Sequence, residues 1–346
     1  MTYKINDVYV LDASTVAGPI EVEGPLVKCF DKIYDDYYMD KKSLELSEVK
    51  LQKDAIDILL NKTGKNIKDI DLLVGGDLQN QITATSHAAN YSHLPFLGIY
   101  SACATSMESI IIASNFIESK KINNAICVTS SHNLTSEKQF RNPIEYGAPK
   151  PKTATFTSTG GASILLTNEK TNIKITSATI GKIIDMNQKD PNNMGAVMAP
   201  AAADTIYNHI TSLNEKIEDY DLILTGDLGI YGREILKEYM KKEYNINLEK
   251  NYNDCGVMLY NLNKQNEITA GGSGPVCSAL VNYGYILKMM KIKKYKKVLF
   301  VTTGALFSPI FTFEKENILP IAHAVCMEVV EWHIYIHFYL QDYYVW

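Results

Sequence analysis

The sequence predicts an α/β protein made of two duplicated halves that pack as one body. The first observation is a repeat: DIDLLVGGDL at residues 69–78 returns as DYDLILTGDL at residues 219–228. The second is that a basic helix end and an apolar strand follow each copy, as ESKKINNAICVTSS and KIKKYKKVLFVTTG. The third is the alternation of buried-type apolar runs with amphipathic helices, which predicts mostly parallel sheets covered on both faces.

Each half is expected to carry the same elements in the same order. Apolar spacing predicts helices over residues 43–62 and 107–119, and Gly64 ends the first. Small-residue turns, YSACATSM in the first half and AGGSGPVCSALV in the second, open a helix each. We therefore divide the chain into residues 1–168, residues 169–328 and a divergent aromatic tail, 329–346. Residues 133–157 are expected to run over the functional face.

Composition excludes several function classes. The 346 residues carry a net charge of −5, so a nucleic-acid partner is not expected. The six cysteines form no C-x-x-C pair, no residue set has metal-ligand spacing, and no cofactor is expected. The N-terminus is too polar for a signal peptide. The sequence contains no run of about 18 apolar residues, so no membrane span is expected. Reduced thiols and a cytoplasmic location are expected.

Cys103 stands at the predicted junction between a strand at residues 96–100 and the helix that follows. A thiol there faces the free N–H groups and the positive end of the helix dipole, and both favour the reactive thiolate. A small buried side chain in a tight turn explains the same residue equally well. The residues alone leave both interpretations open.

A set of long motifs then indicates a family. They occur in order between about residue 16 and residue 328: AGPIEVEGPL, FDKIYDD, GDLQNQ, ACATSMES, TSSHN, EKQFRNPIEYGAPKPKTAT, MGAVMAPAAADTI, DYDLILTGDLG, DCG, AGGSG and IAHAV. With these motifs the chain resembles the stage V sporulation protein AD family within the thiolase and ketoacyl synthase superfamily. The resemblance implies a thiolase-like fold, an α-β-α-β-α body.

The same resemblance implies a function. Members of the family bind dipicolinic acid, a planar aromatic dicarboxylate, and serve its passage into the developing spore beside membrane-embedded partners. We therefore expect a peripheral protein on the cytoplasmic face of a spore membrane. Superfamily members are mostly dimers, so a homodimer is also expected, paired through the strand near Ile126.

The candidate ligand contacts combine a helix start with nearby donors. Backbone N–H groups at Cys103–Ser106 suit one carboxylate, and Arg141 suits the other through its forked guanidinium. Lys150 and Lys152 lie on the same excursion, although solvated surface lysines are the simpler interpretation. His132 and His323 are ligand candidates with a structural role as the alternative. The full predicted set is Cys103, Ala104, Thr105, Ser106, His132, Asn133, Arg141, Lys152 and His323.

Catalysis is not expected. Condensing enzymes of the superfamily place histidine or asparagine opposite the cysteine, but the corresponding loops here read TGDLGIYG, AGGSGPV and TTGALFSP. Without a positioned base, Cys103 cannot readily cycle through acyl transfer. A non-catalytic binding protein is therefore preferred. An acyltransferase or condensing enzyme with Cys103 as nucleophile, and a ligand-free scaffold that docks membrane partners, are the alternatives.

The remaining polar candidates are interpreted as structural. Asp77 and Asp227 close the two repeated strands, where aspartate commonly caps a turn. His87 and His93 are expected on the surface, and His209 at a helix end in a favourable dipole contact.

Overall fold

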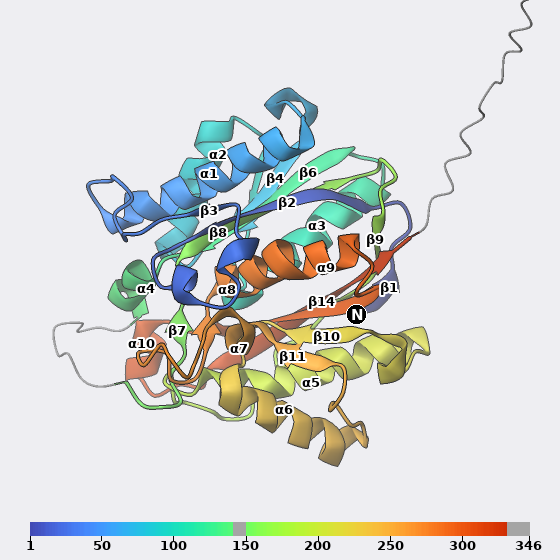
Figure 1. The fold of residues 1–346 in the computed structure, drawn as a ribbon. Helices are drawn as coiled ribbons and strands as arrows, with labels where there is room; N and C mark the ends of the chain where they lie inside the picture. The colour runs from blue at the N-terminus through green and yellow to red at the C-terminus, as the bar shows by residue number, and fades with distance from the viewer. Residues whose placement is uncertain (141–149, 331–346) are drawn as a thin grey trace, which may run out of the picture.

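Two five-stranded sheets with the same strand order, joined to each other at one edge, enclose a layer of helices and form the body of the protein (Figure 1). The computed structural model describes residues 1–140 and 150–330. In the first half the strand order is β5-β4-β6-β8-β2, and in the second it is β11-β10-β13-β14-β9. One residue pair, Tyr9 with Lys174, joins β2 to β9.

The strands of the first half are β2 (Tyr9–Ala17), β4 (Leu72–Gly76), β5 (Phe96–Gly98), β6 (Asn124–Ser131) and β8 (Gly160–Thr167). Those of the second are β9 (Ile173–Ile180), β10 (Leu222–Thr225), β11 (Tyr252–Asp254), β13 (Lys297–Leu306) and β14 (Leu319–Val329). The short strands are β1 (Thr2–Lys4), β3 (Lys32–Ile33), β7 (Phe156–Thr157) and β12 (Gly272–Ser273). Strands β1 and β3 extend the large sheet, and β7 pairs with β12.

Strand directions also repeat between the halves. β4 runs parallel to β5 and β6, while β8 is antiparallel to both β6 and β2. β10 is parallel to β11 and β13, and β14 is antiparallel to β13 and β9. The two repeated sequence segments become β4 and β10, at equivalent places in the strand order of each half. The predicted duplication of an α/β unit is confirmed.

The helices form three layers around the two sheets (Figure 1). The outer layer of the first half is α1 (Leu44–Thr63) and α2 (Thr83–Ser92), and that of the second is α5 (Met194–Leu213) and α6 (Gly229–Tyr244). The middle layer is α3 (Thr105–Glu118), α8 (Pro275–Val281) and α9 (Leu287–Lys291). Three short helices, α4 (Asn133–Phe140), α7 (Cys255–Leu259) and α10 (Pro309–Phe313), lie in the connections. The predicted α-β-α-β-α layering is confirmed.

Local sequence explains where α1 begins and ends. The Ser43 hydroxyl accepts a hydrogen bond from the Leu46 N–H at 3.4 Å, which caps the first turn. Gly64 follows the last turn with a φ of 67°, in the left-handed region that favours glycine. The helix predicted over residues 43–62 is confirmed.

The strand near Ile126 lies inside its sheet, so the predicted dimer contact through this strand is wrong. It is β6, which pairs with β4 on one side and with β8 on the other. A strand with both sides occupied has no free backbone groups for a second copy. The edge of this half is β5, so any pairing between copies through this sheet has to use β5.

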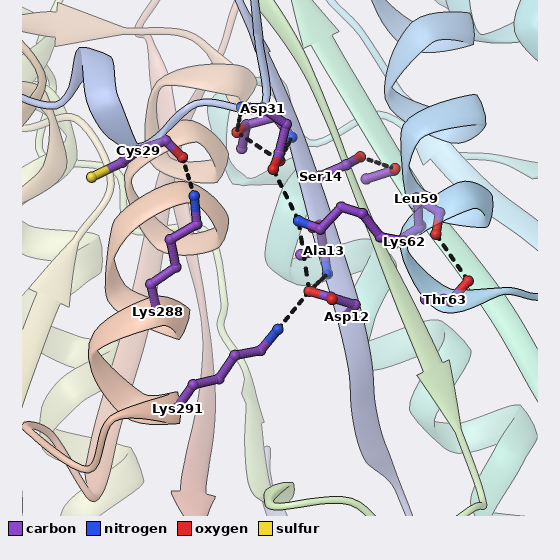
Figure 2. A network of polar contacts seen from close by, with 12 residues as sticks. Asp12, Ala13, Ser14, Cys29, Asp31, Leu59, Lys62, Thr63, Lys288 and Lys291 are labelled. Carbon is purple, nitrogen blue, oxygen red and sulfur yellow. Dashed lines mark hydrogen bonds and ion pairs between the residues drawn. The ribbon is translucent and has the colours of Figure 1, made fainter.

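A polar network ties the second half to the first (Figure 2). The Lys62 ammonium group, on α1, donates to the Ala13 carbonyl at 2.5 Å and to Asp31 at 3.0 Å. It also lies 3.8 Å from Asp12 on β2. Lys291 on α9 approaches the same Asp12 oxygen at 2.7 Å. Two cations from different halves thus share one carboxylate beside the β2–β9 seam.

In the part of the chain that the structure describes, no helix combines the length and the apolarity needed to cross a lipid bilayer.

The substitution Lys62→Met is expected to lower the free energy of unfolding by about 1 kcal/mol, because a charged donor to a carbonyl and two carboxylates is lost. The matched control is Lys65→Met, which removes only a pair with the exposed Glu169 and should cost less than about 0.5 kcal/mol. Urea unfolding followed by circular dichroism measures both. Equal losses in the two variants would contradict a structural role for the network.

Candidate functional site

The turn around Cys103 is held by hydrogen bonds within it. Ala102 has a φ of 48°, a left-handed conformation that costs a non-glycine residue energy. The Thr105 hydroxyl compensates, since it accepts from the Ser101 N–H at 3.1 Å and donates to the Ala102 carbonyl at 2.7 Å. Gly304 on β13 passes so close that a Cβ atom there would lie 2.3 Å from the Ser101 carbonyl oxygen. The second half therefore helps to fix the turn.

Three loops of the second half converge on this turn. The Asp227 carboxylate, after β10, accepts from the Thr303 hydroxyl at 2.7 Å and from the Gly274 N–H at 3.3 Å. The Cys103 thiol lines the same cavity as this carboxylate, close enough for the Asp227 charge to act on it. These are the loops that the sequence placed opposite the cysteine. They supply a carboxyl group there instead of a histidine or an asparagine.

A cavity of about 480 Å³ opens beside this cluster. Its size falls within the range of about 300–1,000 Å³ that is usual for small-molecule sites. The aromatic and apolar walls include Tyr100, Phe140, Met194, Met198, Phe307 and Phe313. The polar lining includes Cys103, Asp227, Glu137, Lys150, Asn192 and Ser273. The Lys150 ammonium group forms an ion pair with Glu137 at 2.5 Å.

The electrostatics of Cys103 favour the protonated thiol, the second of the two interpretations that the sequence left open. Burial raises the pKa of the Cys103 thiol well above its usual value, and the neighbouring Asp227 charge raises it further. The N-terminus of α3 opposes this shift, but a helix dipole contributes less than the removal of water and an adjacent carboxylate. These effects favour the thiol over the thiolate, and the thiol is a poor nucleophile.

The two repeated aspartates have different surroundings. Asp77 accepts from the Gln79 and Thr85 N–H groups at 2.7 Å each, so it caps the turn before α2 as expected. It lies beside buried Glu48, whose pKa is raised to about 8 by burial and by the Asp77 charge. Asp227 instead lines the cavity, and burial raises its pKa to about 7. The interpretation of Asp227 as purely structural is incomplete.

His132 and Asn133 lie behind the cavity wall. His132 is fully buried and donates from Nε2 to the Tyr37 carbonyl at 3.0 Å, and burial lowers its pKa. The Asn133 side chain donates to the Thr157 carbonyl at 3.1 Å. Both anchor the start of α4, which contributes Ser136, Glu137 and Phe140 to the lining. They position the wall, and a direct ligand contact by either residue stays a prediction.

His323 is also a buried neutral group. Its Nδ1 accepts from the Gly181 N–H at 3.2 Å, so Nε2 carries the proton and lies 3.3 Å from the Ser101 hydroxyl. Burial lowers its pKa to about 4. It supports the cysteine turn from behind and is not part of the lining.

The other predicted contacts divide into three groups. Ala104, Thr105 and Ser106 are buried under the turn, whereas Cys103 lines the cavity. Lys152 is exposed outside the lining, while Lys150, two residues earlier, is part of it. Arg141 and the tail from residue 331 onward lie outside the described residues.

For three further histidines the sequence predicts no contact with a ligand. His87 and His93 are exposed, as expected. His209 is fully buried, 2.7 Å from the Thr179 hydroxyl and 3.2 Å from that of Ser177. Burial lowers its pKa to about 4, so a neutral ring bonded to β9 replaces the expected dipole contact.

Sequence reasoning missed Asp227, Glu137 and Tyr100 as lining residues. The repeat gave a usable signal for Asp227, because the loop after β10 belongs to the set that faces the cysteine. Within residues 1–140 and 150–330, no group of three or more histidine, cysteine, aspartate or glutamate side chains is arranged to hold a metal ion.

A cysteine turn between two duplicated five-stranded sheets, with second-half loops opposite the thiol, defines a thiolase-like protein. Solved structures agree. Cerulenin-bound OleA of Xanthomonas campestris matches with a TM-score of 0.59 and 14% identity, covering 93% of this chain and 97% of that one. The 3-oxoacyl-[acyl-carrier-protein] synthase III of Aquifex aeolicus VF5 matches with a TM-score of 0.56 and 10% identity, covering 93% and 99%. These similarities show the fold.

Sequence similarity is more specific. Residues 2–328 match the stage V sporulation protein AD family. Stage V sporulation protein AD of Bacillus subtilis (strain 168) is 44% identical over 322 residues, which are 93% of this chain and 94% of that protein. The chain belongs to the stage V sporulation protein AD family, and the resemblance seen in its motifs is confirmed.

The raised pKa of Cys103 leads to a labelling prediction. Iodoacetamide should modify Cys103 slowly near neutral pH, and Asp227→Asn should speed the reaction roughly three- to tenfold, because the carboxylate no longer opposes the thiolate. Mass spectrometry of the Cys103 peptide over time measures the rate.

The control is Asp77→Asn, which changes the equivalent aspartate of the other half and should leave the Cys103 rate unchanged. Fast labelling of the wild type, or no acceleration in Asp227→Asn, would show that Asp227 does not suppress the thiolate.

Proposed function

We propose that this protein is a non-catalytic binding protein for dipicolinic acid that serves the passage of this ligand into the developing spore. Membership of the sporulation family supports the process. The single observation that carries the ligand proposal is the cavity beside Cys103. Its aromatic and apolar walls suit a planar ring, and its polar groups suit carboxylates.

Among the described residues that line the cavity, one carries a positive charge that can pair with a carboxylate of the ligand. Lys150 lies on the wall, in an ion pair with Glu137 and with its ammonium group 5.9 Å from the centre of the Phe156 ring. An incoming carboxylate can share this ammonium group, which has three donors. Polar groups near Cys103, including the Ser273 side chain, are candidates for the other carboxylate.

A condensing enzyme is the weaker alternative. The fold and the position of Cys103 favour it, but burial and the Asp227 charge raise the pKa of the thiol and so oppose the thiolate. A carboxyl group with a pKa of about 7 is a candidate base. Its charge, however, raises the pKa of the nucleophile it would have to activate. Steady turnover of an acyl thioester, abolished in Cys103→Ala, would favour the enzyme over the binding protein.

We also propose that the protein acts at the cytoplasmic face of a spore membrane beside membrane-embedded partners. This proposal rests on the family resemblance alone. Co-purification of the protein with membrane proteins encoded beside it tests this part independently of ligand binding.

Lys150 gives the ligand proposal a sharp test. Calorimetric titration with dipicolinic acid should show binding to the wild type, and Lys150→Met should weaken it about tenfold or more, since a charge-assisted hydrogen bond is lost. Lys152→Met is the matched control and should change the affinity by less than about twofold. Cys103→Ala should weaken binding less than Lys150→Met, because the thiol only lines the wall.

The outcomes separate the alternatives. No binding to the wild type would leave the ligand-free scaffold as the better function. Equal losses of affinity in Lys150→Met and Lys152→Met would show that the ligand carboxylate binds away from the cavity lining that the structure describes.

A homodimer is a further part of this proposal. In the described part of the chain, β5 has β4 on one side only, and Leu97 on β5 is 38% exposed. An edge strand of this kind can pair with its copy across a two-fold axis.

Light scattering at micromolar concentration should therefore give twice the chain mass of 38.8 kDa. Leu97→Lys should shift the protein towards the monomer, because like charges meet across the axis. Ile292→Lys, at an exposed position away from this strand, is the control and should stay dimeric. A monomeric wild type would overturn the dimer.

A further inference from the structure

Asp227 combines burial with access to the cavity. The residue is 1% exposed, yet it belongs to the lining next to Cys103. One carboxyl oxygen accepts from the Thr303 hydroxyl and the other from the Gly274 N–H. The group is therefore held in a fixed orientation by β13 and by the loop before α8.

The described groups that face Asp227 are acidic or neutral. Cys103 comes from the turn before α3, Cys277 from α8, and Asp254 and Cys255 from the segment β11–α7. Asp254 already accepts from the Thr225 hydroxyl and from two backbone N–H groups of the loop after β10. In the wall that the structure describes, the cation is Lys150, which Glu137 already pairs.

We propose that Asp227 is protonated when the cavity is occupied and donates this proton in a hydrogen bond to one carboxylate of the ligand, so that the dicarboxylate binds together with one proton. This inference rests on the proposed function and specifies the ionisation of the site. Asp227 is then the residue that selects a carboxylate at this end of the cavity.

Electrostatics provide the reason. Two carboxylates in contact at a buried site repel each other strongly, and one of them has to take up a proton. The resulting O–H···O⁻ hydrogen bond is among the stronger kinds in proteins. Burial raises the pKa of Asp227 to about 7 before any ligand binds, and a bound carboxylate raises it further. Below this pKa the proton is already present, whereas above it the proton must come from solvent.

Titration calorimetry at about pH 6 and about pH 8.5, each in two buffers with different heats of ionisation, measures the protons taken up per ligand. Both carboxyl groups of dipicolinic acid are ionised at either pH. Uptake should be close to zero at the lower pH and close to one at the higher. Affinity should fall by up to about tenfold per pH unit above pH 7, or about 30-fold in total.

Asp227→Asn tests the assignment to this residue. Its amide can donate a hydrogen bond at every pH but is a weaker donor than the acid. It should bind up to about tenfold more weakly at the lower pH and lose both the pH dependence and the proton uptake. Asp77→Asn, at the repeated position outside the cavity, should keep the wild-type pH dependence. The wild-type uptake alone tests the proposal if a variant fails to fold.

The outcomes distinguish the two proposals. Binding with equal affinity and no proton uptake at both pH values would overturn the role of Asp227 and leave the proposed function standing. Uptake that persists in Asp227→Asn would assign the proton to another group. No binding at either pH would overturn both proposals.

Discussion

The contact between the first turns of α3 and α8 is the constraint on which the rest of the structure depends. The Ser106 and Ser278 hydroxyls lie 3.1 Å apart there, one from each half. Both helices are sandwiched between two sheets, so only small side chains allow such an approach. Because each helix follows a turn that ends at the same face, this contact brings the Cys103 turn next to the Gly274 loop. The cavity is a consequence of how the two halves meet.

Duplication explains why one motif has two outcomes. Asp77 and Asp227 follow equivalent strands and end in the same Gly-Asp-Leu sequence. In the first half the aspartate caps a turn against Glu48 under α1. In the second half the aspartate lies beside the cysteine turn of the first half and lines the cavity. The same local sequence therefore yields a structural cap in one half and a cavity group in the other.

Burial decides the chemistry of the site more than local geometry does. A cysteine before a helix is usually activated by the free N–H groups, but here the thiol is partly buried and an acid lies beside it. Both effects favour protonated groups. Protonated groups of this kind are suited to hydrogen bonding with an anion and poorly suited to nucleophilic attack, so the proposed binding role is compatible with the fold of an acyl-transfer enzyme.

Much of the fold was determined by the sequence itself. The repeat at residues 69–78 and 219–228, the Ser43 cap and Gly64 specified the duplicated halves and the bounds of α1, because these signals are local and periodic. The motifs also identified the family and the three loops opposite Cys103.

Tertiary structure alone decided which side chains of those loops face the cavity. His132 follows β6 and His323 lies within β14, and packing turned each towards backbone partners instead of the cavity. Lys150 and Lys152 are two positions apart in the sequence, but only Lys150 lines the cavity. The ionisation of Cys103 and Asp227 depends on neighbours that are far apart in sequence, and no local pattern encodes those contacts.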